Sequence, residues 1–394
     1  MSRYDVVVVG GRVAGASTAL LLACSGVRVI LIDRDRYGSD TLSTHGLMRA
    51  GVLQLHRWGV LPDVLAAGTP PIREVIFSYS DGERTSIAIR PSAGVGALFA
   101  PRRYLLDRLL VDAAAAAGVE IRHETSVTAL LRDSVERVVG VRVRRRLGGS
   151  AGIQADLTVG ADGVRSTVAD QVDAPVEWRG VTASAFLYRY FHDLPTAGYE
   201  WFYGDHAAAG LIPTNDGSCV FVATTPAGLR TLRRNGAEQA FALLLASAAP
   251  ALVHRIAATT PVSRLHGWAG TPGYLRRCWG PGWALVGDAG YFKDPITTHG
   301  MTDALRDAEL LADAVLDALS GAPSAAPFTA YQHTRDRLSR QLFDTTEAVA
   351  AYDWDLDQVR RLLRQVSAAM GDEVDHLEAL PATPNGVPAG SHRG

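Results

Sequence analysis

The hydrophobic positions at the start of the chain predict a strand, a helix and a second strand in succession. Residues 4–9 form a Val-rich run, which is typical of a parallel strand buried on both faces. Residues 16–24 carry small apolar side chains at helical spacing, and Gly26 ends this helix. A second apolar run, residues 27–32, leads directly into Asp33. The pattern predicts a βαβ unit, the beginning of a Rossmann-like α/β domain.

The pattern changes in the middle of the chain, where aromatic residues become frequent and alternate with other side chains. Alternation of this kind is typical of antiparallel strands with one apolar face. The strands that we expect here span residues 183–191, 208–213 and 218–225. The chain then returns to a buried strand at 283–286 and a long helix at 301–319.

These changes of pattern divide the 394 residues into segments. We expect a nucleotide-binding domain whose first part is residues 1–172, an inserted sheet domain at 173–282, a return to the first domain at 283–320, helices at 321–380 and a disordered Pro/Gly-rich tail at 381–394. A chain of 394 residues is long enough for two domains, since one domain usually has about 150 residues.

The composition excludes several classes of protein. Lys and Arg number 39, and Asp and Glu number 41, so the formal net charge is -2, which argues against nucleic acid as the main partner. Hydrophobic residues make up 47% of the chain, enough for a large core. No apolar run reaches the roughly 18 residues of a membrane helix, and the N-terminus lacks the pattern of a signal peptide. We therefore expect a cytoplasmic protein without an integral membrane segment.

Cysteine and lysine are both rare. Cys24, Cys219 and Cys278 lie far apart in the sequence, so they predict buried, reduced thiols rather than disulfides or a metal site. Lys293 is the single lysine, and every other residue of the Lys/Arg type is arginine. This limits any mechanism that requires a lysine.

The turn after the first strand has the chemistry of a dinucleotide-binding site. Glycines in residues 10–15 let the backbone approach a pyrophosphate, and the following helix offers N–H groups and the positive end of its dipole. Asp33 lies near the spacing of about 20 residues expected for an acid that binds a ribose hydroxyl. Arg12 stands at the second glycine of the G-x-G-x-x-G pattern, and its side chain either folds outward or contacts a phosphate.

Two later motifs place carboxylates at the ends of strands. The first is Asp162-Gly163 in a tight turn, and the second is Gly287-Asp288, which Pro295 and then His299-Gly300-Met301 follow at the start of a long helix. The second carboxylate can accept a hydrogen bond from a ribityl hydroxyl. The helix dipole suits a reduced, anionic flavin ring.

In this order, with the aromatic insert between the last two, the three motifs resemble those of the single-FAD-domain flavoprotein monooxygenases, the p-hydroxybenzoate hydroxylase-like family. Flavin-dependent halogenases and geranylgeranyl reductases share its fold. The resemblance covers residues 4–319. It implies an α/β protein with a Rossmann-like FAD-binding domain, an inserted antiparallel-sheet substrate domain and a C-terminal helical region. It also implies FAD as cofactor and NAD(P)H as a transient electron donor.

The resemblance assigns cofactor roles position by position. The implied FAD contacts are Gly10, Arg12, Ala14, Gly15, Asp33, Arg34, Arg103, Val127, Asp162, Gly163, Asp288, Pro295, Gly300 and Met301. Among these, Arg103 begins a helix, Val127 meets the adenine through its backbone, and Asp162-Gly163 is linked to both FAD and NAD(P)H.

Two Thr-His-Gly triplets, residues 44–46 and 298–300, are expected to flank the flavin ring. His45 and His299 are therefore the candidate catalytic residues, because imidazole titrates near neutral pH and can donate or move a proton. The alternative for each is a loop histidine satisfied by backbone contacts. In the family the aromatic face roofs the substrate pocket, and the candidate substrate-binding residues are Tyr188, Tyr190, Trp201 and Tyr203. The alternative is an ordinary aromatic core.

The resemblance implies an FAD-dependent monooxygenase acting in specialised metabolism. Such an enzyme inserts one oxygen atom from O₂ into a small organic substrate, here aromatic or polyketide-like, through a flavin C4a-hydroperoxide. NAD(P)H or a partner flavin reductase supplies the electrons.

Three alternatives stay open. A geranylgeranyl-type reductase usually carries Cys-Gly-Glu where this chain has His45-Gly46-Leu47. A halogenase uses a lysine and a W-x-W-x-I-P segment, of which only Ile212-Pro213 is present here. A non-enzymatic flavin-binding module would bind FAD without oxidising a reduced pyridine nucleotide.

Overall fold

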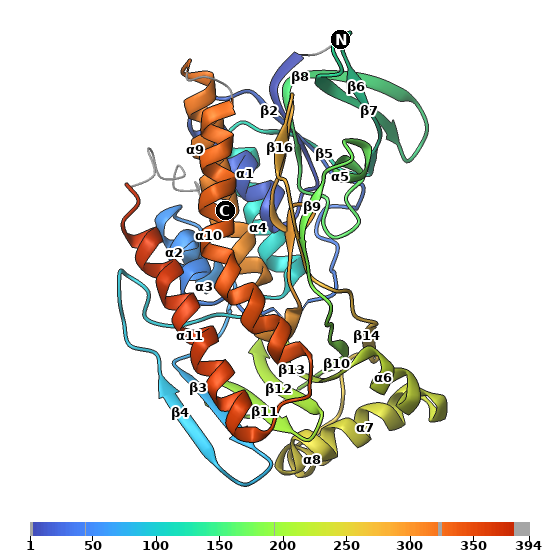
Figure 1. Cartoon of the computed structure of the whole chain (residues 1–394), viewed down its shortest axis with the longest axis vertical. Helices are drawn as coiled ribbons and strands as arrows, with labels where there is room; N and C mark the ends of the chain where they lie inside the picture. The colour runs from blue at the N-terminus through green and yellow to red at the C-terminus, as the bar shows by residue number, and fades with distance from the viewer. Residues whose placement is uncertain (1–2, 44, 193, 322–324, 382–394) are drawn as a thin grey trace.

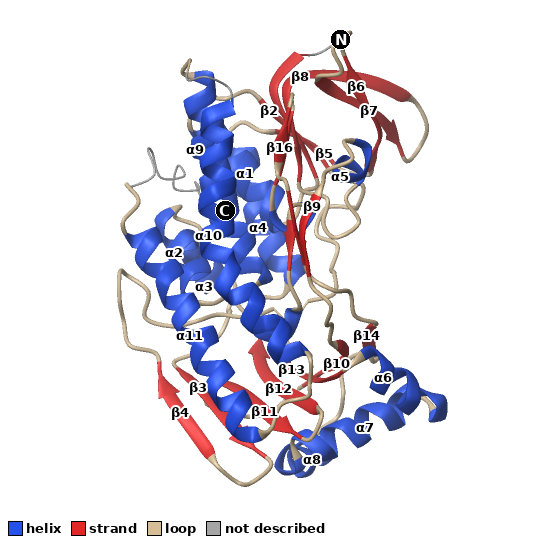
Figure 2. Cartoon of the chain, viewed as in Figure 1, coloured by secondary structure: helices blue, strands red, loops and turns tan. Residues whose placement is uncertain are grey.

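The computed structural model describes residues 3–43, 45–192, 194–321 and 325–381 (Figure 1). Figure 2 shows helices packed along one side of a first sheet and a separate group of strands at the other end of the molecule. Thr44 and all but the first residue of the predicted tail, 381–394, lie outside the described residues. Among the described residues, no helix combines the length and apolar character needed to cross a bilayer.

The first sheet has eight strands and is built around β1 (Arg3–Val9). β1 pairs in parallel with β2 (Val29–Ile32) and with β8 (Ser150–Gly160). The other strands are β5 (Glu120–Arg122), β6 (Thr125–Arg132), β7 (Val138–Arg145), β16 (Trp279–Gly280) and β17 (Trp283–Leu285). Because β17 is parallel to β8, the turns after β1, β8 and β17 meet at one edge of the sheet.

The predicted βαβ unit is confirmed. Helix α1 (Val13–Cys24) packs between α4 (Arg103–Ala116) and α9 (Gly300–Leu319) on one face of the sheet (Figure 1). Val6, Val7 and Val8 are all buried, which explains the uninterrupted apolar run: both faces of β1 are covered. The shorter helices near this domain are α2 (Arg49–Arg57), α3 (Leu61–Ala66) and α5 (Thr167–Gln171).

The second sheet has seven strands in the order β14-β10-β13-β12-β11-β3-β4. They span Glu74–Tyr79 (β3), Arg84–Ala88 (β4), Ala185–Phe191 (β10), Tyr199–Gly204 (β11), Ala207–Thr214 (β12), Gly217–Thr224 (β13) and His266–Trp268 (β14). Neighbouring strands are antiparallel, except that β11 and β3 are parallel. The three strands predicted in this region correspond to β10, β12 and β13.

Strands β3 and β4 come from a part of the chain that the sequence pattern placed in the nucleotide-binding domain. β4 is exposed along its whole length. It therefore has no apolar run from which the sequence could predict a strand. It forms because β3 extends the sheet beyond β11 and offers it a partner. The second sheet therefore draws on residues 74–88 as well as on the insert, and the domain boundaries stay a prediction.

Helices cover both faces of the second sheet. The outer face carries α6 (Pro226–Leu232), the short helix η1 (Arg233–Asn235), α7 (Ala237–Ala248) and α8 (Pro250–Ala257). The aromatic face packs against the segment between α10 (Ala325–Ala350) and α11 (Leu356–Glu378), including Tyr352 and Trp354. A third sheet has three strands, β9 (Val176–Arg179), β15 (Tyr274–Arg276) and β18 (Tyr291–Phe292), with β15 in the middle.

Candidate functional site

The turn between β1 and α1 depends on glycine for its backbone contacts. A Cβ atom at Gly15 would overlap the carbonyl oxygen of Gly10, and a Cβ at Gly10 would overlap the carbonyl oxygen of Ala161. Helix α1 starts in this turn without a side-chain cap and without an acidic residue in its first turn. Its N-terminal N–H groups and the positive end of its dipole are therefore suited to a phosphate.

Asp33 ties this turn to the loop after β2. Its Oδ2 accepts a hydrogen bond from the Gly11 N–H at 2.5 Å, and its Oδ1 accepts one from the Asp35 N–H at 2.6 Å. A carboxylate offers about four lone-pair sites. Asp33 therefore keeps acceptor capacity for a ribose hydroxyl.

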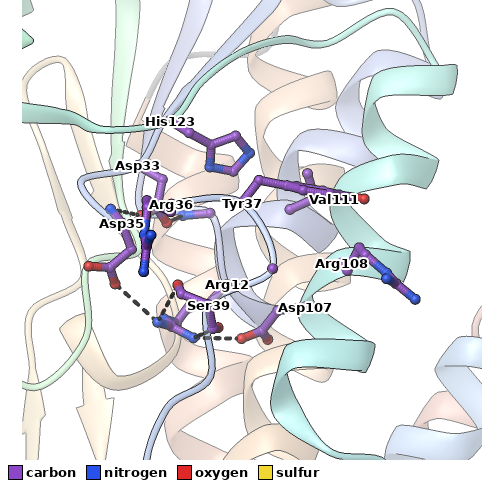
Figure 3. A pocket seen from close by; sticks show the side chains of 12 residues that line it. Arg12, Asp33, Asp35, Arg36, Tyr37, Ser39, Asp107, Arg108, Val111 and His123 are labelled. Atoms are coloured by element: carbon purple, nitrogen blue, oxygen red, sulfur yellow. Dashed lines mark hydrogen bonds and ion pairs between the residues drawn. The ribbon is translucent and has the colours of Figure 1, made fainter.

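A small pocket adjoins Asp33 (Figure 3). Four segments line this pocket: the glycine turn, the loop after β2, helix α4 and the residue that follows β5. The lining residues are Gly11, Arg12, Asp33, Asp35, Arg36, Tyr37, Gly38, Ser39, Asp107, Arg108, Val111 and His123. Glycine backbone together with aromatic and charged side chains in this pocket is compatible with the adenosine half of FAD. Arg34, next in sequence to Asp33, is exposed at the surface.

Arg12 turns across this pocket rather than away from the protein. Its guanidinium forms ion pairs with Asp107 at 2.9 Å and Asp35 at 3.0 Å, and it donates a hydrogen bond to the Ser39 carbonyl (Figure 3). Arg103 pairs with the same Asp107 carboxylate at 3.1 Å. Two guanidinium groups thus share the Asp107 carboxylate near the start of α1, and Asp35 pairs with one of them.

The Asp162-Gly163 turn is held by its own carboxylate. Asp162 accepts hydrogen bonds from the Ser166 hydroxyl at 2.5 Å and from the Thr167 N–H at 2.7 Å. Val127, the predicted adenine neighbour, is half-buried on β6. Asp162 therefore orders a turn at the same sheet edge as the glycine turn.

The turn after β17 brings the predicted flavin-ring residues to this edge. It runs through the short helices η2 (Gly287–Ala289) and η3 (Pro295–Thr297) into α9. Asp288 is half-buried, and burial raises its pKa to about 6, while Arg103 and Lys293 oppose the shift. Helix α9 begins without a side-chain cap, and the space around the Cα of the exposed Gly300 is open. Pro295 and Met301 are half-buried beside it.

Gly46 of the first Thr-His-Gly segment lies next to Thr298 of the second, and the expectation that the two segments flank a flavin ring stays a prediction. A Cβ at Gly46 would overlap the Thr298 methyl group. His45 (φ 61) and Thr298 (φ 53) both adopt the left-handed backbone conformation that non-glycine residues rarely accept. Strained residues of this kind persist where the surrounding structure holds them, and they gather at functional sites.

The two histidine side chains point in different directions. His45 is completely buried, and its Nε2 forms a hydrogen bond with the Tyr190 hydroxyl. Within the described residues its Nδ1 has no hydrogen-bond partner. Burial and the neighbouring Arg102 and Arg103 lower the pKa of His45 to about 3. His45 is therefore neutral at physiological pH, with one ring nitrogen bound to Tyr190 of the second sheet.

His299 points away from the sheet, toward α11. Its Nε2 lies 2.5 Å from Glu373 Oε2 and 3.8 Å from Asp303 Oδ1. These three residues could in principle bind a metal ion, but Lys293 and Arg306 already pair with the same two carboxylates. The site is therefore an ion cluster, and the catalytic role of His299 stays a prediction.

The four predicted substrate residues share one buried face but form two groups. Tyr188 stacks on His266 with ring centroids 5.0 Å apart, and Arg102 lies 3.9 Å over the Tyr190 ring. These two tyrosines border the His45 loop. Trp201 packs against Tyr199 and Phe221, and Tyr203 packs against Tyr79 and Trp354 under the C-terminal helices.

The sequence reasoning missed Arg102, Asp107, Arg306 and Glu373. Asp107 had a signal, because it lies one helical turn after Arg103 on the same face of α4. Glu373 had none: it lies far from every motif, on a helix that was expected only as a C-terminal addition.

Comparison with known proteins decides the family. A family model described as "FAD binding domain" matches residues 3–346. This chain belongs to the FAD-binding domain family. It is 26% identical to a digeranylgeranylglycerophospholipid reductase of Methanocella arvoryzae over 86% of this chain and 85% of that protein. It is 29% identical to a kynurenine 3-monooxygenase of Salinispora arenicola over 93% of this chain and 83% of that one.

The solved structures agree in fold. The flavin-dependent brominase Bmp2 superposes with a TM-score of 0.78 at 21% identity, over 96% of this chain and 99% of the brominase. The predicted family, fold class and FAD cofactor are thus confirmed, and the FAD-binding domain protein described here is an FAD-dependent oxidoreductase. Its glycine turn, its paired guanidiniums and its two uncapped helix N-termini fit that cofactor.

Three glycine-to-alanine variants separate folding from cofactor binding. Gly15→Ala should destabilise the protein by about 3 kcal/mol or more, because its methyl group overlaps backbone. Gly300→Ala should leave the stability of the FAD-free protein unchanged or slightly higher, since its methyl group meets nothing. It should weaken FAD binding at least fivefold.

The control for this series is Gly371→Ala, which lies in α11 with open space around it. Urea unfolding of the FAD-free protein gives the stability, and quenching of flavin fluorescence gives the affinity. Equal stability of the Gly15→Ala variant and the unsubstituted protein would contradict the packing argument.

Arg12 should contribute to FAD affinity through its charge. Arg12→Gly restores the glycine of the pattern but removes a cation beside α1, so we expect FAD binding to weaken about tenfold at low salt, with less loss at high salt. Arg12→Lys should retain part of the effect. Binding that is equal or tighter in Arg12→Gly at every salt concentration would show that the arginine serves only the loop contacts.

Proposed function

We propose that this FAD-binding domain protein is a monooxygenase. It would insert one oxygen atom from O₂ into a small organic substrate, aromatic or polyketide-like, with NAD(P)H or a partner flavin reductase as the source of electrons. The observation that carries the proposal is the contact between the ring-side loop and the aromatic sheet. In the ring-side loop, residues 45–47, His45 bonds to Tyr190, while Gly46 touches Thr298 of the flavin loop, residues 286–299.

The chain's own residues have separable roles in this proposal. The N-terminus of α1, with Arg12 and Arg103, would hold the pyrophosphate of FAD, and Asp33 its ribose. Asp288 would accept a hydrogen bond from the ribityl chain. FAD, when bound, supplies the redox chemistry and the reaction with O₂.

The aromatic face and His45 would govern the substrate. Tyr188 and Tyr190 offer a planar, apolar surface that excludes water from an aromatic compound. The neutral His45 would hold a proton between its ring and the Tyr190 oxygen, close to the reacting atoms. A histidine whose pKa is lowered this far keeps one acceptor nitrogen and one donor N–H throughout the physiological pH range.

A saturating reductase is the second candidate, because a digeranylgeranylglycerophospholipid reductase is among the similar proteins. The residues beside the ring disfavour it. The ring-side loop reads His45-Gly46-Leu47, without the cysteine and the glutamate that this branch usually carries. An aromatic face that carries Tyr188 and Tyr190 is also better suited to a planar ring than to a long aliphatic chain.

A halogenase is disfavoured by the single lysine. The side chain of Lys293 is 2% exposed and pairs with Asp303 inside the ion cluster. A lysine buried in this way cannot capture a hypohalous species in a substrate pocket. The likeness to the brominase is therefore one of fold.

The function is tested by incubating the purified FAD-loaded protein with NADH or NADPH, O₂ and a panel of aromatic and polyketide-like compounds. A product heavier by one oxygen atom, labelled when ¹⁸O₂ is used, is the expected result. A gain of two hydrogens, with an isoprenoid chain as substrate and O₂ absent, would assign the reductase instead. A gain of bromine or chlorine would assign the halogenase.

His45→Asn tests the ring-side role. Asparagine tolerates the left-handed backbone, so the variant should fold and keep FAD, while product formation falls about 100-fold and uncoupled oxidation of NAD(P)H rises. Tyr190→Phe, which removes the partner of the same hydrogen bond, should act in the same direction. His56→Asn, on the surface of α2, is the matched control. Unchanged coupling in both test variants would remove His45 from the chemistry.

A further inference from the structure

Six ionisable side chains form a buried cluster beneath the flavin loop. This ion cluster consists of Lys293, His299, Asp303, Arg306, Asp307 and Glu373, and none of them is more than 5% exposed. Five of them belong to the flavin loop and α9. Glu373 alone comes from α11, at the end of the described chain. The cluster therefore joins the C-terminal helix to the part of the site that faces the ring.

Glu373 uses both of its oxygens in this connection. Oε1 lies 2.9 Å from Arg306 Nη1, and Oε2 lies 2.5 Å from His299 Nε2. Although burial opposes ionisation, His299 and Arg306 hold the pKa of Glu373 below its usual value, so the carboxylate stays charged. A buried charge of this kind keeps its partners in place, because leaving either one unpaired is costly.

The partners of Glu373 lie where the flavin loop becomes α9. His299 stands between Thr298, which contacts Gly46, and Gly300, the first residue of α9. Arg306 lies two turns further along the helix and also bonds Asp303, Asp307 and Ser339 of α10. A shift of α11 would therefore act on His299, the residue directly after Thr298, whose side chain contacts Gly46.

Other charges around Glu373 do not replace its role. Lys293 pairs with Asp303, and burial lowers the lysine pKa to about 7. Asp307 is occupied by Arg306. Among the described residues of α11, Glu373 alone forms ion pairs with the flavin loop and α9.

We propose that Glu373 is a positioning residue that couples the docking of α11 to FAD binding. The C-terminal helix then completes the cofactor site without touching the cofactor. The proposal rests on FAD binding, which the family establishes, and not on oxygen transfer. Because coupling between two sites is reciprocal, FAD should order α11 to the same extent that a docked α11 strengthens FAD binding.

The first experiment uses the unsubstituted protein. Hydrogen–deuterium exchange is measured on the full chain with and without FAD, and peptides from α11 should exchange at least tenfold more slowly when FAD is bound. Helix α7, on the outer face of the second sheet, serves as an internal reference that should not change. Equal exchange of α11 in both states would overturn the proposal, whatever the variants do.

The second experiment compares Glu373→Gln with Asp372→Asn, an exposed neighbour on the same helix. Glu373→Gln should weaken FAD binding at least tenfold, as measured by quenching of flavin fluorescence, and should abolish the protection of α11 by FAD. Asp372→Asn should match the unsubstituted protein. A lower melting temperature with unchanged FAD affinity would show a purely structural role and overturn the proposal.

A double-variant cycle identifies the route of the coupling. If Glu373 acts through His299, the two substitutions should not add up. The double variant His299→Gln/Glu373→Gln should then bind FAD at least as tightly as the single variant that has the lower FAD affinity. Independent, additive losses would contradict that route. These experiments measure FAD affinity and hydrogen exchange, not product formation. They can therefore be carried out even if the protein binds FAD but forms no oxygenated product.

Discussion

The contact between three backbone segments, at Gly10, Gly15 and Ala161, is the constraint on which the rest of the site depends. It allows β1, the start of α1 and the end of β8 to approach more closely than any side chain would permit. The N-terminus of α1 is thereby aimed along the edge of the first sheet. Asp33 and the two guanidiniums that share Asp107 gather around it, so one small turn organises this end of the site.

The far end of the site is built by long-range contacts instead. The ring-side loop and the flavin loop touch at Gly46 and Thr298, although about 250 residues separate them in sequence. Left-handed backbone at His45 and Thr298 is held there by the buried surroundings. With this contact in place, His45 bonds to Tyr190 of the aromatic sheet and His299 bonds to Glu373 of α11.

The buried charges carry a physical cost that explains their arrangement. Each cation of the ion cluster faces at least one carboxylate, and Arg306 meets three. Isolated charges at this depth would be strongly unfavourable. The network pairs each cation with a carboxylate and links the flavin loop, α9 and α11. It also explains why the single lysine is unavailable to a substrate.

The sequence alone determined the βαβ unit, the dinucleotide turn, Asp33, Asp288 and the aromatic alternation, because each depends on neighbours within a few residues or on one strand's period of two. Tertiary structure decided what those rules cannot reach. It brought β3 and β4 into the second sheet, turned Arg12 across the pocket, and sent His45 and His299 in opposite directions. It also carried Glu373 to the flavin loop. Side-chain direction and pairing between distant segments depend on how the layers pack, and packing is a property of the whole chain.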